Sequence, residues 1–455
     1  NIQKNQITEG IIWRQLLLFF FPILLGTFFQ QLYNTIDSVI VGQFVGKEAL
    51  AAVGGSSAQI VAFVVGFFTG LSSGASVTIA QFFGAKDSRS ANKGLHTAYA
   101  IAAFGGLILT VSGIILTPFL LEMMNTPADI VADSAVYLRI YFAGIIFVLI
   151  YNMGSAILRA TGDSKRPLYY LIVCCIINIV LDVLFVIVFH MGVMGVAVAT
   201  LIAQAVSAVL VTLKLMRSEG ILKLSVKQIR FHGSILKMQL KLGLPTGFEA
   251  ILFSITNIAI QSAVNTFGTD TTAAWSAYGK LDAIFWMVST AFGIAITTFV
   301  GQNYGAGKMD RVRKSTRVCL LMDFIVSAVL VVFLIAARFL LFRLFTNDSH
   351  VIEIGCDMLV LITPWYIVYV FIEVIAGALR GVGNVVVPVA ITLLGVCVLR
   401  IAWLAAMLKI SPTISAIILS YPVTWVITAL AFIIYYIYIT HKTIAGSSKK
   451  HVPKL

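Results

Sequence analysis

Four polar side chains lie inside stretches of sequence that are otherwise apolar, and their types suggest cation chemistry. Asp37 interrupts the first apolar stretch, Asn178 and Asp182 share the fifth, and Thr200 lies in the sixth. Asn178 and Asp182 are four residues apart, so a helix places them on one face. Two carboxylates, an amide oxygen and a hydroxyl form a set of oxygen ligands that suits a hard cation such as Na+, or a shared proton.

The same four residues fall at similar depths if the apolar stretches are membrane-spanning helices. At about 1.5 Å per residue, Asp37 lies roughly 15 Å below the outer end of its stretch, and Asp182 and Asn178 lie roughly 12 and 18 Å below theirs. Thr200 lies roughly 10 Å from the outer end. An ionisable group at this depth costs about 2.5 to 3.5 kcal/mol, and the first half supplies no Lys or Arg there as a partner. We expect these residues to bind a cation or to share a proton.

The second half of the chain has ionisable residues of its own in apolar sequence. Glu249 and Glu373, near the inner ends of their stretches, are candidates for substrate contact or for a structural role. Lys280, Asp282 and Arg400 fall in the outer layer, where the prediction is structural ion pairing with one another.

Four further residues belong to the first helix of each half. Gln30 and Asn34 precede Asp37 and are additional candidates for lining a substrate cavity. Pro22 and Pro245 occupy early positions in their helices, where a missing backbone hydrogen bond permits bending.

All these residues have to be positioned by helices that cross a membrane. The 455 residues are 59% hydrophobic and only 11% charged, whereas soluble chains are about 25% charged. A spanning helix needs about 20 apolar residues. Twelve stretches qualify, near residues 15–44, 50–80, 94–117, 134–158, 168–189, 193–215, 243–266, 272–300, 315–337, 357–380, 386–408 and 413–439. The fold class is therefore an all-α integral membrane protein.

The net charge of +13 reflects membrane orientation rather than nucleic-acid binding, because the basic residues sit in short gaps between the apolar stretches. With a cytoplasmic N-terminus, the inner segments hold 25 Lys and Arg and the outer segments hold four. This asymmetry predicts that both termini are cytoplasmic. The first apolar stretch, Leu16 to Val45, is too long for a signal peptide and is expected to remain as a span. The five cysteines show no metal-ligand spacing.

Two motifs recur at one offset and divide the chain into two repeats. The segments 159–163 and 380–384 share an Arg-x-x-Gly-[Asp/Asn] pattern, and 81–85 and 302–306 share Gln-x-x-Gly-Ala. Both pairs have the same offset in numbering, which is 221. Six helices per repeat place both repeats in the same orientation, as parallel repeats about an axis along the membrane normal. The expected domains are an N-lobe at 1–216, a basic cytoplasmic linker at 217–241, a C-lobe at 242–440 and a cytoplasmic tail at 441–455.

These motifs and the two six-helix halves resemble the multidrug and toxic compound extrusion (MATE) transporters over nearly the whole chain. Pro22 and Asp37 in helix 1, Asn178-x-x-x-Asp182 in helix 5 and Thr200 in helix 6 look like the N-lobe cation site of the DinF-like bacterial branch. The resemblance implies a rocker-switch antiporter that exports cationic or amphipathic organic compounds as Na+ or H+ enters. It implies no cofactor beyond that transported ion.

One position departs from the family pattern. NorM-like and eukaryotic members carry an acidic residue about two turns past the helix 7 proline, where this chain has Phe253, while Glu249 lies one turn past Pro245. This difference favours coupling through the N-lobe.

Three alternative functions would each be expected to show different features from those in the sequence. A lipid-linked oligosaccharide flippase of the same superfamily would be expected to line its cavity with more basic side chains, and it stays open as the alternative. A polyprenyl transferase would need a cluster such as Asp-Asp-x-x-Asp, which the sequence lacks. A channel fits poorly with a two-fold repeat and buried paired carboxylates. The expected partners are the lipid bilayer of the plasma (inner) membrane and cationic or amphipathic organic small molecules, with no nucleic acid. The protein is expected to work as a monomer.

Overall fold

The computed structural model describes residues 6–446, and throughout this range the regular structure is helical. The predicted cytoplasmic tail at 441–455 is described only as far as Gly446, and residues 447–455 lie outside the described part. Within residues 6–446, twelve helical segments are long and apolar enough to cross a membrane, which confirms the predicted all-α membrane fold. Helices are the expected solution, because a helix satisfies its backbone hydrogen bonds internally where lipid offers no partner.

The first six spans are built from seven of the first eight α-helices, after a short α1. Their bounds are α1 Gln6–Glu9, α2 Ile12–Phe44, α3 Lys47–Gly54 with α4 Ser56–Gly84, α5 Ser88–Met123, α6 Val131–Ala160, α7 Lys165–Asp182 continuing into a π-helical turn at Val183–Val188, and α8 Gly192–Met216.

The second six spans follow a linker with two 3₁₀ turns, Gly220–Leu222 and Val226–Gln228. Their bounds are α9 Gly233–Asn265, α10 Thr269–Gly305, α11 Met309–Arg343, α12 Ser349–Ile362 with α13 Tyr366–Gly381 after the 3₁₀ turn Thr363–Trp365, α14 Val386–Thr392 with the π-helical turn Leu393–Val398 and α15 Leu399–Ile410, and α16 Ile414–Ile418 with α17 Ser420–Gly446.

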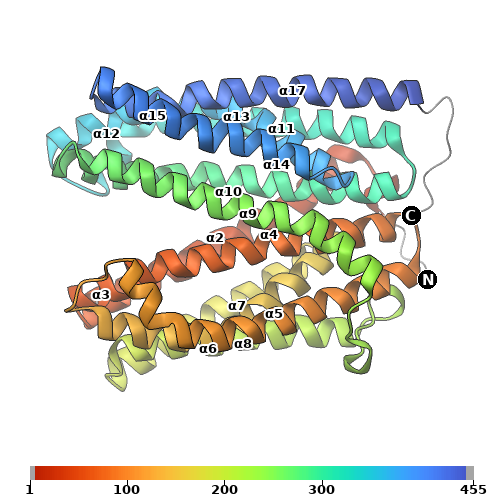
Figure 1. Ribbon diagram of the computed structural model, residues 1–455, viewed down its shortest axis with the longest axis horizontal. Helices are drawn as coiled ribbons and strands as arrows, with labels where there is room; N and C mark the ends of the chain where they lie inside the picture. The colour runs from red at the N-terminus through yellow and green to blue at the C-terminus, as the bar shows by residue number, and fades with distance from the viewer. Residues whose placement is uncertain (1–5, 447–455) are drawn as a thin grey trace. The chain divides into compact units, whose positions relative to one another are not determined.

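The chain forms two compact units. One consists of Phe19–Phe248, and the other joins residues 6–18 to residues 249–446. In the first unit α6 packs against α4, α5 and α8, and in the second α10 packs against α11, α12 and α13. Figure 1 labels these helices. Each unit has its own buried apolar core.

The first helix of each predicted half is thus divided between the units, and local contacts explain why. At the start of the chain, the backbone carbonyl of Ile7 accepts hydrogen bonds from Arg311 and Asn303 of the second unit's helices. In α9, Gly247 lies directly against Gly70 of α4, so close that a Cβ on Gly70 would collide with the backbone of Gly247. The glycine at position 70 of α4 therefore lets the N-terminal half of α9 pack tightly on α4.

The offset of 221 seen in the sequence also relates the structural elements. Helices α2 and α9 begin and end at positions related by this offset, and so do the starts of α5 and α11 and of α7 and α14. Both copies of the Arg-x-x-Gly turn place their glycine at positive φ, 96° at Gly162 and 88° at Gly383. Glycine is favoured there because it has no Cβ. The two halves are structural repeats as well as sequence repeats.

The basic linker is fixed to the N-terminal end of α5 by hydrogen bonds. Asn92 Nδ2 donates to the carbonyls of Ile221 and Lys223, each at 3.1 Å. The backbone amide of Ser225 donates to His96 Nε2 at 3.1 Å. The linker therefore has a defined path along the first unit.

Candidate functional site

The four predicted cation ligands come together inside the first compact unit. Asp37 lies in α2, Asn178 and Asp182 lie in α7, and Thr200 lies in α8. All four are buried, with exposed fractions of 8% for Asp37, 1% for Asn178, 0% for Asp182 and 7% for Thr200. Because α7 places Asn178 and Asp182 one turn apart on the same face, both can approach a single point.

The contacts among these side chains leave oxygen atoms without donors. Asn178 Nδ2 donates to Thr200 Oγ1 at 3.5 Å, and Asp37 is close enough to the other three side chains to interact with each of them. Yet Oδ1 of Asp37, both oxygens of Asp182 and Oδ1 of Asn178 are buried and have no hydrogen-bond partner among the described residues. A buried acceptor without a donor is costly, and a cation or proton would remove that cost.

The surroundings of this site are apolar and aromatic. A cluster of aliphatic side chains with Tyr137 lies on α2, α3, α6, α8 and the π-helical turn after Asp182. Nearby, Gln204 Nε2 donates to the Tyr33 hydroxyl at 3.2 Å. Of the ion pairs formed by residues 6–446, none includes Asp37 or Asp182. The two acids therefore lie in a low-dielectric region without a basic partner.

The site differs from a structural metal centre. Among the residues that the structure describes, no group of three or more His, Cys, Asp or Glu side chains could hold a metal ion. Two carboxylates with an amide and a hydroxyl form a smaller and weaker set, which suits a cation that binds and leaves. A π-helical turn directly after Asp182 adds local irregularity, and such turns are frequent at functional sites.

The remaining predicted residues occupy varied places. Gln30 and Asn34 are exposed on α2, and Glu249 is partly exposed on α9. Glu373 Oε1 accepts a hydrogen bond from Arg380 at 3.0 Å, so this candidate for substrate contact also has a structural partner.

The two prolines lie inside uninterrupted helices. Pro22 is within α2 and Pro245 is within α9. Each removes one backbone hydrogen bond from its helix, which leaves a point where bending costs less than elsewhere.

The predicted ion pairing among Lys280, Asp282 and Arg400 is wrong. No ion pair within 4.0 Å joins these residues in the described chain. Lys280 is exposed, and Arg400 donates to Thr424 Oγ1 at 2.9 Å instead.

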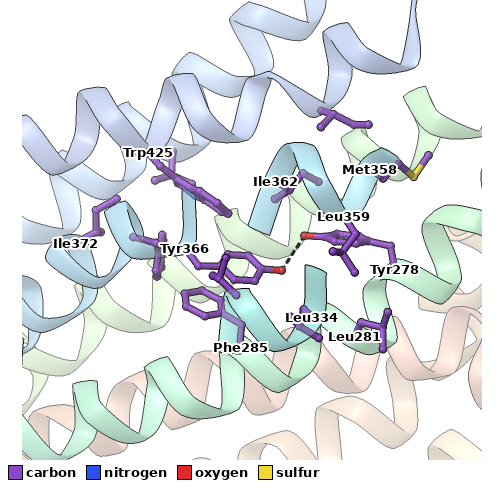
Figure 2. Close-up of a cluster of buried hydrophobic side chains, with 14 of the residues drawn as sticks. Tyr278, Leu281, Phe285, Leu334, Met358, Leu359, Ile362, Tyr366, Ile372 and Trp425 are labelled. Carbon is purple, nitrogen blue, oxygen red and sulfur yellow. Dashed lines mark hydrogen bonds between the residues drawn. The ribbon is translucent and has the colours of Figure 1, made fainter. Parts of the chain in front are cut away.

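Asp282 is stabilised by neutral donors rather than by a basic residue. Its oxygens accept hydrogen bonds from the Tyr278 and Tyr366 hydroxyls and from Trp286 Nε1. Tyr278 and Tyr366 are also joined to each other at 2.9 Å within the core cluster that contains Trp425, as Figure 2 shows.

One buried acid escaped the sequence prediction. Asp323 lies in the middle of α11 with no exposed surface, where Ser327 Oγ donates to its Oδ1 at 3.1 Å while Oδ2 has no partner among the described residues. The signal was available, because Asp323 is a carboxylate in the middle of the apolar stretch near residues 315–337.

Comparison with known proteins supports a family assignment. A family model described as MatE matches residues 22–184 and 245–404, once in each repeat. The probable multidrug resistance protein YoeA of Bacillus subtilis is 30% identical over 85% of this chain and 84% of its own. The probable multidrug resistance protein NorM of Thermotoga maritima is 27% identical over 90% of this chain and 88% of its own.

Solved structures show the same fold. A multidrug resistance MATE family transporter of the MOP superfamily, in an outward-facing conformation, matches with a TM-score of 0.90 over 97% of this chain and 99% of that chain, at 20% identity. A MOP superfamily transporter from Pyrococcus furiosus matches with a TM-score of 0.90 over 99% of this chain and 100% of that chain, also at 20% identity. The family consists of multi-pass membrane transporters and not of enzymes. With two matched repeats covering most of its length, this chain belongs to the MATE family of transporters.

Proposed function

We propose that this protein is a secondary antiporter of the plasma (inner) membrane that exports cationic or amphipathic organic compounds in exchange for Na+ or H+. The coupling cation binds at Asp37, Asn178, Asp182 and Thr200. The observation that carries this proposal is the set of buried oxygens without donors on three of these side chains. The relatives described above are named for multidrug resistance, so the flippase alternative is not favoured.

The chemistry of coupling follows from burial and repulsion. Two carboxylates in one desolvated site repel each other, so the pair holds a proton or a metal cation more readily than two bare charges. Loading and release of the cation change the charge beside α2. Pro22 lies in the same helix, about four turns from Asp37. Bending of α2 in response to that charge would link cation exchange to alternating access by a rocker-switch movement.

The proposal includes the protein's oligomeric state, its topology, its lobes and the residues of its substrate cavity. The protein works as a monomer in the bilayer, with both termini in the cytoplasm, and binds no nucleic acid. The lobes are 1–216 and 242–440, joined by the linker at 217–241, and Gln30, Asn34, Glu249 and Glu373 contribute to the substrate cavity. Ion coupling is general in the family and requires no further cofactor.

Efflux of a cationic dye from proteoliposomes tests the coupling site. Under separately imposed Na+ and H+ gradients, Asp37→Asn and Asp182→Asn should each reduce gradient-driven efflux to the level of protein-free vesicles. Asp129→Asn, an exposed acid between α5 and α6, is the matched control and should keep the wild-type rate. Wild-type efflux by both Asp37→Asn and Asp182→Asn would exclude this site and leave the acids of the second half as candidates.

The neutral ligands distinguish Na+ from H+. Asn178→Ala and Thr200→Ala should weaken Na+ binding, because each removes an oxygen ligand, while leaving proton-driven efflux less affected. Ser207→Ala serves as control, since Ser207 is a buried hydroxyl on the same helix that donates to the carbonyl of Gln204. Equal loss under both gradients would show that the two side chains act structurally.

A further inference from the structure

The second repeat contains the helices of the cation site without its acidic residues. Helices α7 and α14 begin at positions related by the offset of 221, and both run into a π-helical turn. In the first repeat this turn follows Asp182, at Val183–Val188, whereas in the second it comes earlier, at Leu393–Val398. A π-helical turn inserts one residue, so positions after it shift by one. After its own turn, the second repeat is therefore one residue ahead, and the offset between equivalent residues should be 222. Once the first repeat has also passed its turn, the offset should return to 221.

Burial confirms this shift. Within residues 174–182 of the first repeat the buried side chains are Cys174, Cys175, Asn178 and Asp182, and within residues 396–404 of the second they are Val396, Cys397, Arg400 and Leu404. Taken in order, the members of each pair are related by the shifted offset of 222. Arg400 thus takes the place of Asn178, and Leu404 takes the place of Asp182.

The other two ligands are also replaced. At the offset of 221, Tyr421 stands in place of Thr200, and Ile258 stands in place of Asp37. The position that holds two carboxylates in the first repeat therefore holds none in the second. It holds a guanidinium group instead.

Arg400 is buried without an acidic partner. Its exposed fraction is 3%, and its Cζ lies 4.0 Å from the centre of the Tyr421 ring and 5.9 Å from that of Trp425. Asp282, an acid in the same aromatic cluster, receives its hydrogen bonds from other side chains, as described above, and is not within ion-pair distance of Arg400. A buried guanidinium normally requires a paired anion.

Three buried donors, one on Arg400 itself and two on neighbouring residues of α17, have no acceptor among the described residues. They are Arg400 Nε, Trp425 Nε1 and Ser420 Oγ. Arg400 donates to the Thr424 hydroxyl, which donates in turn to the carbonyl of Ser420 at 2.6 Å. Ser420 therefore lies one helical turn before Thr424, and Trp425 directly follows Thr424 in the chain. Trp425 and Ser420 are at most 1% exposed. Unmet buried donors are rare and call for a specific acceptor.

We propose that this place in the second repeat binds a small monovalent anion, either a chloride ion or a carboxylate group. Arg400 supplies the positive charge through Nε, and Trp425 Nε1 and Ser420 Oγ complete the set of donors. An arginine guanidinium and an indole N–H can only donate, which suits an anion and excludes a metal cation. The two repeats then carry sites of opposite charge at equivalent positions.

Thermal unfolding of the purified full-length protein in detergent tests the anion site. At constant Na+ and ionic strength, gluconate is replaced stepwise by chloride in one series and by acetate in another. A saturable rise in Tm is expected in at least one series, because a ligand that binds only the folded state stabilises it. A rise with chloride alone identifies a halide site, and a rise with acetate identifies a carboxylate site.

Three variants and a control assign the effect. Arg400→Met should abolish the anion-dependent rise, and Trp425→Phe and Ser420→Ala should each weaken the apparent affinity by roughly tenfold, the loss of about one hydrogen bond to a charged group. Trp286→Phe, which removes the indole N–H that bonds Asp282, should leave the anion affinity unchanged. If Arg400→Met does not fold, the other two variants decide the question.

The outcomes against the proposal are equally clear. The proposal is overturned if anions leave the Tm of the wild type unchanged. It is also overturned if Arg400→Met keeps the wild-type anion affinity, or if Trp425→Phe and Ser420→Ala both do. Asp37→Asn should keep the anion effect in full, so this result is separate from the coupling proposed for the first repeat. Crystals soaked in bromide should show anomalous scattering within hydrogen-bond distance of Arg400 Nε if the site takes a halide.

Discussion

Glu373, a predicted candidate for substrate contact, forms an ion pair with Arg380. Their side chains are only 21% and 16% exposed, and the contact is 3.0 Å. Removing one member of a largely buried pair leaves the other without compensation, which costs more than removing both. Any loss of transport in a Glu373 variant therefore has to be separated from a loss of stability.

A double-mutant cycle makes that separation. Glu373→Gln should lower the stability of the purified protein by about 1 to 3 kcal/mol, because the Arg380 guanidinium loses its partner. Glu373→Gln combined with Arg380→Gln should recover part of the loss. Denaturation in detergent measures both. If the double variant is as unstable as the sum of the single variants, the pair has no structural role and substrate contact becomes the better explanation.

At the scale of single residues, the sequence predicts which side chains meet but not how they are partnered. Asp37, Asp182, Asn178 and Thr200 could be placed together because depth along a helix follows from counting residues. The partners of Arg400 could not be found this way. They depend on a π-helical turn that shifts the residues after it by one position, and no residue type in that segment predicts such a turn.

Among the helices, α5 and α11 differ in how they begin. Asp87 caps α5 by accepting a hydrogen bond from the Ser90 amide at 3.0 Å. Hydrogen bonds from the side chain and then the backbone of Ser90 lower the pKa of the Asp87 carboxyl. At the equivalent place before α11 stands Lys308, which makes no side-chain cap and instead donates to the carbonyl of Thr8 at 3.0 Å.

The cap of α5 should therefore weaken in acid. Because the pKa of Asp87 is lower in the folded state, its stabilising effect is fully present above the ordinary value near pH 4 and is lost as the pH falls through the folded value. Asp87→Ala should destabilise this helix end by about 0.5 to 2 kcal/mol at neutral pH, and the difference from wild type should shrink below about pH 4.

Hydrogen exchange of the first amides of α5 measures this effect. The control is Asp310→Ala, which removes a fully exposed acid in the first turn of α11 that caps nothing. A difference between wild type and Asp87→Ala that is the same at pH 7 and at low pH would contradict a charged cap.

At this scale the sequence predicts more than it does for single contacts. The twelve spans were found because an apolar run of this length has few other solutions in lipid. The break between α3 and α4 at Gly55 and the short 3₁₀ turn Thr363–Trp365 inside the tenth span were not predicted. Such breaks depend on local packing, and hydropathy averaged over a whole span does not register them.

For the whole molecule, the predicted orientation in the membrane can be tested by labelling single cysteines. With both termini in the cytoplasm, a cysteine replacing exposed Lys227 in the linker should react with a membrane-impermeant thiol reagent only from the inside. A cysteine replacing exposed Asp129 should react only from the outside. Labelling of intact cells and of inverted vesicles measures this. The five native cysteines are all buried, so background labelling should be low. Labelling of both sites from one side would refute the predicted topology.

The division of α2 and α9 between the two compact units bears on how the polypeptide is made. The first unit extends to Phe248, and so includes the N-terminal half of α9, where Gly247 packs on Gly70. Synthesis proceeds from the N-terminus at about 5 to 20 residues per second. After the sixth span emerges from the ribosome, the surface of α4 around Gly70 therefore stays uncovered until the linker and the start of α9 have been translated. The length of the linker then sets how long this surface stays uncovered during synthesis. A gene cut at residue 216 would yield a first fragment without the start of α9, the segment that packs on α4.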